Sequence, residues 1–223
     1  PEYEAAFDLK EPLVTVCIAT YNRGPLLAER SLRSIVNQQY DNWECIVVGD
    51  CCTDKTAEII DSMNEPRIQF INLPERGSYP LDPFLRWMVA GTTPLNKALE
   101  LAQGAFVTHL DDDDEHPPDR IRKLVHYIQE HRLDFIWHPF VKELPSGRWQ
   151  HKPCKRFRRY EITTSSVFYH HWLKRIPWDI NAWRYREPGD WNRFRKFKYL
   201  NIRAARYPEM LLKHFKERNQ TTA

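Results

Sequence analysis

Residues 95–121 read LNKALELAQGAFVTHLDDDDEHPPDRI, and this stretch decides the fold. Residues 95–103 have the spacing of an amphipathic helix, and Gly104 follows it as a favoured C-terminal residue. Residues 105–110 are nearly all apolar and predict a strand buried on both faces. Pro117-Pro118 then opens a second helix, expected to continue to about His131. This order of elements is typical of an α/β domain with a mainly parallel sheet.

The sequence before this stretch shows the same alternation of strand and helix. Strands are predicted at residues 13–19, 43–48 and 67–72, and helices at residues 26–39 and 53–63. We therefore expect a Rossmann-like, mainly parallel sheet flanked by helices. After Asp134 the pattern is less regular, with strands predicted at 135–137, 140–141 and 163–169 and helices at 191–200 and 208–216. Residues 77–93 are expected to form an irregular, partly ordered loop over a site.

Composition excludes several classes of protein. The chain has 223 residues, of which 42% are hydrophobic and 28% are charged, so a packed core is expected and wholesale disorder is not. No window approaches the roughly eighteen consecutive apolar residues of a transmembrane helix, and no secretory signal is evident. Five cysteines without a CxxC pair or a Cys/His spacing argue against zinc and fit a reducing compartment, so we expect a cytoplasmic protein.

The net charge of +3 hides an uneven distribution. Residues 1–150 carry 15 Lys and Arg against 24 Asp and Glu, a balance of −9, whereas residues 151–223 carry 18 against 6, a balance of +12. The basic end predicts an anionic partner, such as phosphates or a membrane surface, although a solvated basic face explains the same charges. No recognition helix, RNP-like motif or zinc motif accompanies it, so we do not expect nucleic-acid binding.

A run of carboxylates, residues 111–115, follows the strand at 105–110. These side chains repel one another, and the run is costly at the end of a buried strand unless a cation binds there. Oxygen-rich clusters suit Mg²⁺ or Mn²⁺. In an extended chain Asp111 and Asp113 point to the same side, so this pair can share one ion. An acidic helix start without a metal is the alternative.

Two other strand ends carry polar side chains. Thr20-Tyr21-Asn22-Arg23 follows the first predicted strand, and residues 49–54, GDCCTD, follow the second. Ligands of open α/β sheets bind at the carboxyl ends of strands, so these residues are expected in one crevice. An Asp there can accept a hydrogen bond from a base imide N–H, and a Tyr can stack on the ring. The pattern predicts a nucleotide site.

Three stretches together resemble the family 2 glycosyltransferases, which have the GT-A fold: VTVCIATYNR, ECIVVGDCCTDKT and the stretch at 95–121. The resemblance covers residues 12–125 strongly and 160–200 more loosely. It implies one GT-A domain over residues 1–223, with a nucleotide-sugar-binding half near 12–125 and an acceptor-binding half near 126–223. It also implies an inverting transfer from a nucleotide-diphosphate sugar, expected to be a UDP-sugar, to a hydroxyl of a glycan or lipid-linked acceptor.

The resemblance also implies roles for individual residues. The nucleotide-binding residues would be Thr20, Tyr21, Arg23, Asp50, Arg76 and Asp112. Asp111 and Asp113 would be the two acids of the DXD motif that bind Mn²⁺ or Mg²⁺, with Asp113 the direct ligand. Asp190, in REPGDWNRF, would be the catalytic base, because an inverting transfer needs a carboxylate to take a proton from the attacking hydroxyl. A helix-capping role is the alternative for Asp190.

Departures from the family pattern leave other functions open. Gly49 replaces the first Asp of an Asp-Asp pair, Cys51-Cys52 replaces Gly-Ser, and Gly189 stands where a Glu is usual. A non-catalytic module that binds a nucleotide sugar or an anionic glycan is therefore the alternative. A sugar nucleotidyltransferase is disfavoured, because no Gly-rich, cationic loop follows the first strand. The processive Gln-x-x-Arg-Trp motif is absent, which favours addition of a single sugar, and the basic end is expected to reach the inner membrane face.

Overall fold

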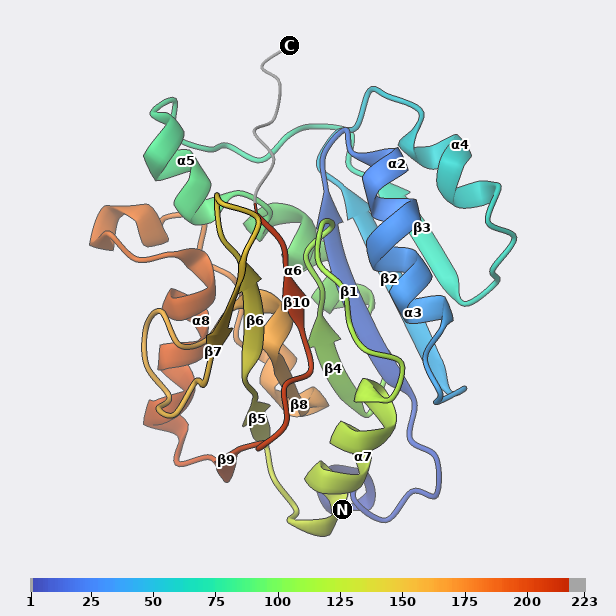
Figure 1. The fold of residues 1–223 in the computed structure, drawn as a ribbon, viewed down its shortest axis with the longest axis vertical. Coiled ribbons are helices and arrows are strands. Elements are labelled where there is room, and N and C mark those ends of the chain that lie inside the picture. The colour runs from blue at the N-terminus through green and yellow to red at the C-terminus, as the bar shows by residue number, and fades with distance from the viewer. Residues whose placement is uncertain (1, 217–223) are drawn as a thin grey trace.

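The structure is a computed structural model and describes residues 2–216. A seven-stranded sheet with the strand order β3-β2-β1-β4-β8-β5-β9 forms its centre (Figure 1). A smaller sheet has the order β10-β6-β7. The strands of the large sheet are β1 (Val14–Thr20), β2 (Trp43–Gly49), β3 (Ile68–Asn72), β4 (Phe106–His109), β5 (Phe135–Trp137), β8 (Val167–His170) and β9 (Ala204–Arg206). Those of the small sheet are β6 (Phe140–Glu143), β7 (Trp149–Lys152) and β10 (Lys213–His214).

Helices cover both faces of the large sheet. Figure 1 shows α2, α3 and α7 on the near side and α6 on the far side. The α-helices are α1 (Glu2–Ala5), α2 (Gly24–Leu26), α3 (Arg33–Val36), α4 (Thr56–Asp61), α5 (Pro83–Val89), α6 (Thr92–Leu101), α7 (Arg120–Glu130) and α8 (Gly189–Phe197). A π-helical segment, Leu27–Leu32, joins α2 to α3. Val16 and Cys17 of β1 point to opposite faces and are both fully buried, as expected for a strand covered on both sides.

The first four strands confirm the predicted parallel sheet. β1 pairs in parallel with β2 and with β4, and β2 pairs in parallel with β3. Thr20, the last residue of β1, lies opposite Gly49, the last residue of β2. The polar residues that follow β1, β2 and β4 therefore begin at the same edge of the sheet.

The second half of the chain is less regular, also as predicted. β8 lies antiparallel between β4 and β5, and β9 adds in parallel to β5. Short 3-10 helices connect these elements at Thr164–Ser166, His171–Arg175, Ala182–Tyr185 and Lys198–Leu200. The strands β5, β8 and β9 have three or four residues each, compared with seven in β1 and β2.

Two local predictions were wrong. Residues 208–216 do not form a helix: Lys213 exchanges backbone hydrogen bonds with Glu115 at 2.9 and 3.1 Å, and β10 pairs in parallel with β6. Leu211 and Leu212 are both buried, and two consecutive buried leucines suit an extended segment covered on both sides as well as a helix. The strand predicted at 163–169 begins only at Val167, because Thr164–Ser166 form a 3-10 helix. Residues 77–93 are partly ordered, as expected, because they contain α5, whose first turn is capped by the Asp82 carboxylate.

Within residues 2–216, no helix combines the length and apolar character needed to cross a membrane. All five cysteines have free thiols. Cys17 and Cys45 lie in the core of the large sheet, as their apolar neighbours predicted.

Candidate active site

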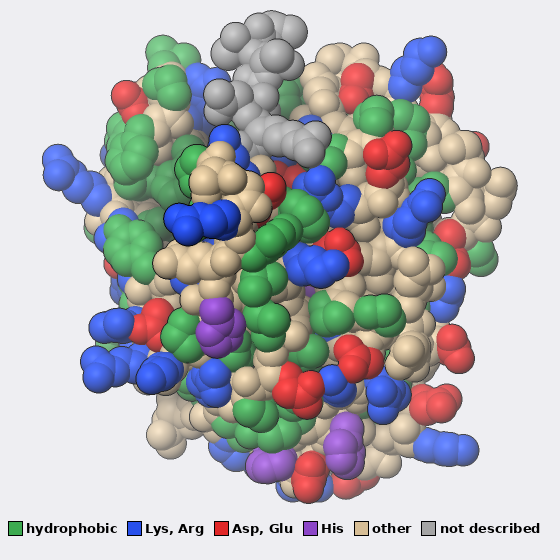
Figure 2. All heavy atoms as spheres, viewed as in Figure 1, with side chains coloured by type: hydrophobic (Ala, Val, Ile, Leu, Met, Phe, Trp, Pro, Cys, Tyr) green, Lys and Arg blue, Asp and Glu red, His purple; other side chains and the backbone are tan. Residues whose placement is uncertain are grey.

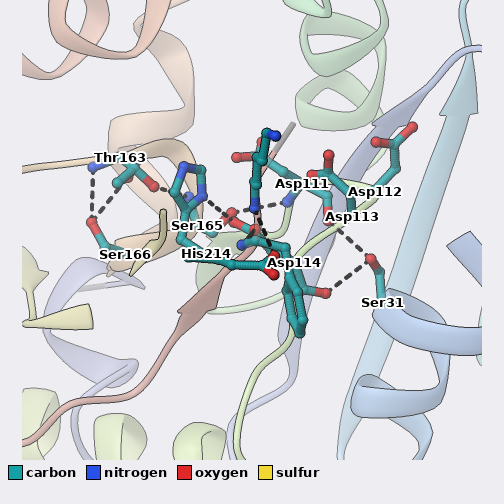
Figure 3. A network of polar contacts seen from close by, with 12 residues as sticks. Ser31, Asp111, Asp112, Asp113, Asp114, Thr163, Ser165, Ser166 and His214 are labelled. Carbon is teal, nitrogen blue, oxygen red and sulfur yellow. Dashed lines mark hydrogen bonds and ion pairs between the residues drawn. The ribbon is translucent and has the colours of Figure 1, made fainter. Parts of the chain in front are cut away.

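The acidic run predicted as a metal site forms a tight turn at the end of β4. Figure 3 shows this turn between Ser31, on the π-helical segment after α2, and Ser165, on the 3-10 helix before β8. Ser31 Oγ lies 3.0 Å from the carbonyl oxygens of both Asp111 and Asp114. The Asp111 N–H donates to Ser165 Oγ at 2.9 Å. Hydroxyl groups from two distant segments therefore fix the turn.

Asp111, Asp114 and His214 form a cluster that can bind a metal ion. One ligand atom from each residue lies within 4.8 Å of the others. Asp114 is fully buried, its Oδ2 lies 2.9 Å from His214 Nδ1, and its Oδ1 accepts the Phe215 N–H at 3.0 Å. Two carboxylates and one imidazole suit a divalent cation, and the nitrogen donor favours Mn²⁺ over Mg²⁺, which prefers oxygen ligands.

The electrostatics of this cluster also fit a cation. Burial and the charges of Asp114 and Asp113 raise the pKa of Asp111 well above its ordinary value. Burial opposes protonation of His214, but the charge and hydrogen bond of Asp114 raise the His214 pKa to about 9. The buried carboxylates repel one another, so nearby positive charge stabilises their ionised forms, and a divalent ion would supply such charge.

Asp112 and Asp113 face Arg23. Arg23 Nη1 lies 2.9 Å from Asp112 Oδ1 and 3.1 Å from Asp113 Oδ2. Thr20 Oγ1 donates to Asp112 Oδ2 at 2.8 Å, so the structure brings together three of the predicted nucleotide-binding residues. Burial, followed by the charges of Asp114 and Asp112, raises the pKa of Asp113 to about 6 despite Arg23. Asp113 is not a member of the Asp111, Asp114 and His214 cluster, and its role as the direct metal ligand stays a prediction.

The other predicted nucleotide-binding residues lie together after β1 and β2. The Arg76 guanidinium stacks on the Tyr21 ring, 3.5 Å from its centroid, and Arg76 Nε lies 3.6 Å from Asp50 Oδ2. The Gly77 N–H donates to Asp50 Oδ1 at 3.0 Å. An aromatic face, a guanidinium and a buried carboxylate in contact are groups that can stack on a planar base and accept its imide N–H.

Gly49 departs from the family pattern for a packing reason. A Cβ at this position would lie 2.6 Å from Asn72 Oδ1 and 3.0 Å from Cys52 Sγ. The Asn72 amide is held there because it accepts the Cys52 N–H at 2.7 Å and donates to the Cys52 carbonyl at 2.8 Å. This side chain on β3 thus fixes the turn that carries Asp50 and leaves no room beside it.

Asp190, the predicted base, is the second residue of α8 and is half-buried. Burial raises its pKa to about 6, whereas its neighbour's backbone N–H and the charge of His214 act in the opposite direction. Its Oδ1 accepts the Trp191 N–H at 2.6 Å. Pro188 holds the N-cap position of α8, so Asp190 is not its N-cap residue, but a negative charge in the first turn of a helix is stabilised by the helix dipole. The role of Asp190 as the base stays a prediction.

Gly189, the other departure, packs where two helices meet. A Cβ there would lie 3.1 Å from Thr92 Cγ2 and 3.4 Å from the Met88 carbonyl oxygen. α5 and the start of α6 therefore approach the N-terminus of α8 closely. This contact places the segment at 77–93 next to the residue before Asp190.

Two site residues were missed from the sequence. His214 was missed because residues 208–216 were predicted to form a helix. Asp114 was missed because the DXD spacing selects Asp111 and Asp113. The pair Leu211-Leu212 suits an extended segment as well as a helix, so no local sequence signal singles out His214. His170 and His171 do not approach this site. They bond to the carbonyls of Tyr3 and Gly104, and Gly104 precedes β4 at the end of the strand opposite the acidic turn.

The basic end of the chain is partly used in internal contacts. Arg195 pairs with Glu187 at 2.8 Å, and the Lys198 ammonium lies 5.0 Å from the ring centroids of Phe157 and Trp191. Core packing was expected for most of the aromatic residues interleaved with these cations, Phe157, Tyr160, Trp183 and Tyr185. Phe157 does stack on Phe135, but Tyr160 and Tyr185 are exposed. Figure 2 nevertheless shows Lys and Arg side chains gathered over the region of α8 and β7.

Comparisons with known proteins place the chain in a family. The family model described as glycosyl transferase family 2 matches residues 15–79 and 92–201. WcaA of Escherichia coli strain K12, a glycosyl transferase assigned by its name to colanic acid biosynthesis, is 32% identical over 133 residues, which are 58% of this chain and 41% of WcaA. The chain spans less than half the length of this curated relative.

Solved structures share the fold. Staphylococcus aureus TarS 1–349 in complex with UDP-GlcNAc matches with a TM-score of 0.73 at 21% identity, covering 93% of this chain and 59% of that chain. The mannosyltransferase PcManGT of Pyrobaculum calidifontis, in complex with GDP-Man and Mn²⁺, matches with a TM-score of 0.65 at 19% identity, covering 92% and 57%. The large, mostly parallel sheet is therefore that of the GT-A fold. With the family model matching most of its length, this chain belongs to glycosyl transferase family 2.

Proposed function

We propose that this chain transfers one sugar, with inversion, from a nucleotide-diphosphate sugar to a hydroxyl of a glycan or lipid-linked acceptor, and that the nucleotide is UDP. The observation that carries the proposal is the cluster of Asp111, Asp114 and His214 at the same sheet edge as Tyr21 and Asp50. The nucleotide sugars in the TarS and PcManGT structures support a donor of this class.

The proposed chemistry is a single displacement. Asp190 takes the proton from the acceptor hydroxyl as its oxygen bonds to the anomeric carbon, and the bond from that carbon to the diphosphate breaks on the opposite face. Arg23, beside Asp112 and Asp113, supplies positive charge for the departing diphosphate. A bound Mn²⁺ or Mg²⁺ supplies further stabilisation of that leaving group. Asp111, Asp114 and His214 would hold the ion, with Asp113 retained as a proposed ligand from the DXD motif.

The decisive experiment is calorimetric titration of UDP with and without Mn²⁺, on the wild type, Asp113→Ala and His214→Gln. We expect tight UDP binding only with Mn²⁺, and weakened binding in both variants. Binding of GDP or dTDP, but not of UDP, would still agree with a family 2 glycosyltransferase. It would refute the proposal that the nucleobase of the donor is uracil. Failure of every nucleotide would make the acidic turn structural and favour a module that binds anionic glycans.

The proposal includes a cytoplasmic location, with the chain docked on an anionic membrane surface that presents the acceptor. Phe84 and Trp87 are exposed on α5 and stack on each other. The 3-10 helix Ala182–Tyr185 packs against α5, and the exposed Arg184 and Arg186 lie on this helix and directly after it. Aromatic rings and cations together suit the interface of an anionic bilayer. We expect co-sedimentation with phosphatidylglycerol vesicles, reduced by Phe84→Ser and Trp87→Ser. Equal recovery with phosphatidylcholine vesicles, or none with either lipid, would refute the docking.

The division of the chain is proposed on the same basis, with residues 12–125 binding the donor and residues 126–223 facing the acceptor. Asp50 and Tyr21 lie in the first part, and Asp190 lies in the second.

A further inference from the structure

Ser165 is the residue outside the acidic turn that contacts Asp111 most directly. Its hydroxyl oxygen accepts the Asp111 N–H at 2.9 Å. Ser165 is fully buried, so water does not compete for this bond. One buried side chain thus fixes the backbone of a residue in the candidate metal cluster.

The 3-10 helix that carries Ser165 is locked by its own hydrogen bonds. The Ser165 N–H donates to Thr163 Oγ1 at 3.2 Å, and the Thr163 N–H donates to Ser166 Oγ at 2.9 Å, so the two side chains form a capping box (Figure 3). The carbonyl of Ser166 accepts the His138 N–H at 3.1 Å. These bonds remove the freedom of the turn before it meets Asp111.

Two buried side chains from the segment after the acidic turn hold the same helix by its carbonyls. His116 Nε2 lies 3.1 Å from the Ser165 carbonyl oxygen, and Arg120 Nη2 donates to the Val167 carbonyl at 3.0 Å and to that of Ser165 at 3.4 Å. Arg120 is fully buried, and burial lowers its pKa to about 9. A buried guanidinium is costly to desolvate, and here its donors hold backbone carbonyls at the turn.

We propose that Ser165 is a positioning residue for the metal site, with His116 and Arg120 fixing the turn from which it acts. Ser165 sets the orientation of Asp111, and so ties the C-terminal half of the chain to the metal-binding carboxylate of the N-terminal half. This inference rests on the proposed metal-assisted function. Outer partners of metal ligands commonly change metal affinity by about 10- to 100-fold when removed, because the ligand loses its orientation.

The test compares Ser165→Ala with Ser166→Ala. Both serines are fully buried in one 3-10 helix, but the Ser166 hydroxyl bonds only to the backbone N–H and carbonyl of Thr163 and not to Asp111. We expect Ser165→Ala to weaken Mn²⁺ binding by about tenfold, measured from the room-temperature electron paramagnetic resonance signal of free Mn²⁺. Ser166→Ala is expected to change Mn²⁺ binding less than about twofold while lowering the thermal midpoint as much as Ser165→Ala does.

Ser165→Thr keeps the hydroxyl and is expected to retain most of the Mn²⁺ affinity that Ser165→Ala loses. If Ser165→Ala does not fold, Ser165→Cys is measured in its place. Equal Mn²⁺ affinities in the wild type and Ser165→Ala, or equal losses in Ser165→Ala and Ser166→Ala, would overturn the inference. A wild type that binds no Mn²⁺ would instead overturn the proposed metal-assisted function. UDP titration without metal should be the same in all these proteins, because Ser165 has no contact with Tyr21 or Asp50.

Discussion

The two halves of this chain build the same site in different ways. Around β1, β2 and β4, strands of four to seven residues run in parallel, and the segments after each carry Tyr21, Asp50 and Asp111 at one edge. Beyond Asp134 the strands have two to four residues, and β8 runs antiparallel to its neighbours. There His214 and Ser165 reach the edge from a two-residue strand and a 3-10 helix.

The two halves therefore make different contributions to the candidate site. The regular half places its polar residues by the geometry of the parallel sheet alone, because every strand ends at the same edge. The irregular half contributes groups that act on those residues: His214 bonds to Asp114, and Ser165 bonds to Asp111. The candidate metal cluster therefore forms only when both halves are folded together, and variants in either half test that dependence.

The largest effect is expected at Asp190, in the irregular half. Asp190→Asn keeps the shape of the side chain and removes its ability to take a proton, so we expect the transfer rate to fall by about 10²- to 10⁴-fold. UDP affinity should change less than about twofold, since Tyr21 and Asp50 are untouched. Steady-state kinetics with calorimetry on the same protein separate the two. A normal transfer rate in Asp190→Asn would show that Asp190 is not the base.

The same residue predicts a pH dependence. Burial raises the pKa of Asp190 to about 6, and the carboxyl can act as a base only when it is ionised. At saturating donor and Mn²⁺, kcat should therefore rise as the pH is raised through about 6 and level off above it. A bound cation keeps the nearby carboxylates ionised, so the acid limb reports Asp190. A rate that is flat between pH 5 and 8 would contradict the assignment.

The second effect compares one residue from each half. His214→Gln removes a member of the Asp111, Asp114 and His214 cluster, and we expect the dissociation constant of Mn²⁺ to increase at least about tenfold, the effect typical of removing even an outer partner. Asp113→Asn keeps the contact of Arg23 with Asp112 and tests the DXD assignment. A loss in Asp113→Asn alone would show that the ion binds at Asp113 and not at the His214 cluster.

The sequence predicts the regular half well because its signals are local. Residues 14–20 and 43–49 are continuous apolar runs, and the residues after them needed only the rule that parallel strands end at one edge. His214 and Ser165 could not be found in this way, because distant contacts set their positions. The strand that carries His214 is held through Lys213, which bonds to Glu115, 98 residues away. Ser165 bonds to Asp111, 54 residues away. No local pattern reports a contact of that separation. The packing that requires Gly49 has the same origin, in Asn72 of the neighbouring strand.

The third effect compares the two glycines that depart from the family pattern. Gly49→Ala drives a Cβ to 2.6 Å from Asn72 Oδ1, whose amide is held by two hydrogen bonds, and we expect the free energy of unfolding to fall by about 1–3 kcal/mol. In Gly189→Ala the Cβ would lie 3.1 Å from the Thr92 methyl and 3.4 Å from the Met88 carbonyl oxygen, which is an ordinary contact, so a loss of about 1 kcal/mol or less is expected. Urea unfolding of both variants measures this difference. A larger loss of unfolding free energy in Gly189→Ala than in Gly49→Ala would contradict this expectation. It would show that the contact of α8 with α5 and α6 tolerates an added methyl group less well than the turn after β2 does.

The smallest effect is expected at Arg76, which lies entirely within the regular half. Its guanidinium stacks on Tyr21 at 3.5 Å and is partly exposed, so the contact is worth about 0.5–1 kcal/mol. If Arg76 contributes the same stacking and charge to a bound nucleotide, Arg76→Ala should weaken UDP binding by about fivefold or less, and Arg76→Lys, which keeps the charge without the planar group, should lie between. Titration with UDP and Mn²⁺ measures both. Tighter UDP binding in Arg76→Ala would mean that the guanidinium competes with the nucleobase for the Tyr21 ring. The contact between Arg76 and Tyr21 would then have to break before the nucleotide stacks there.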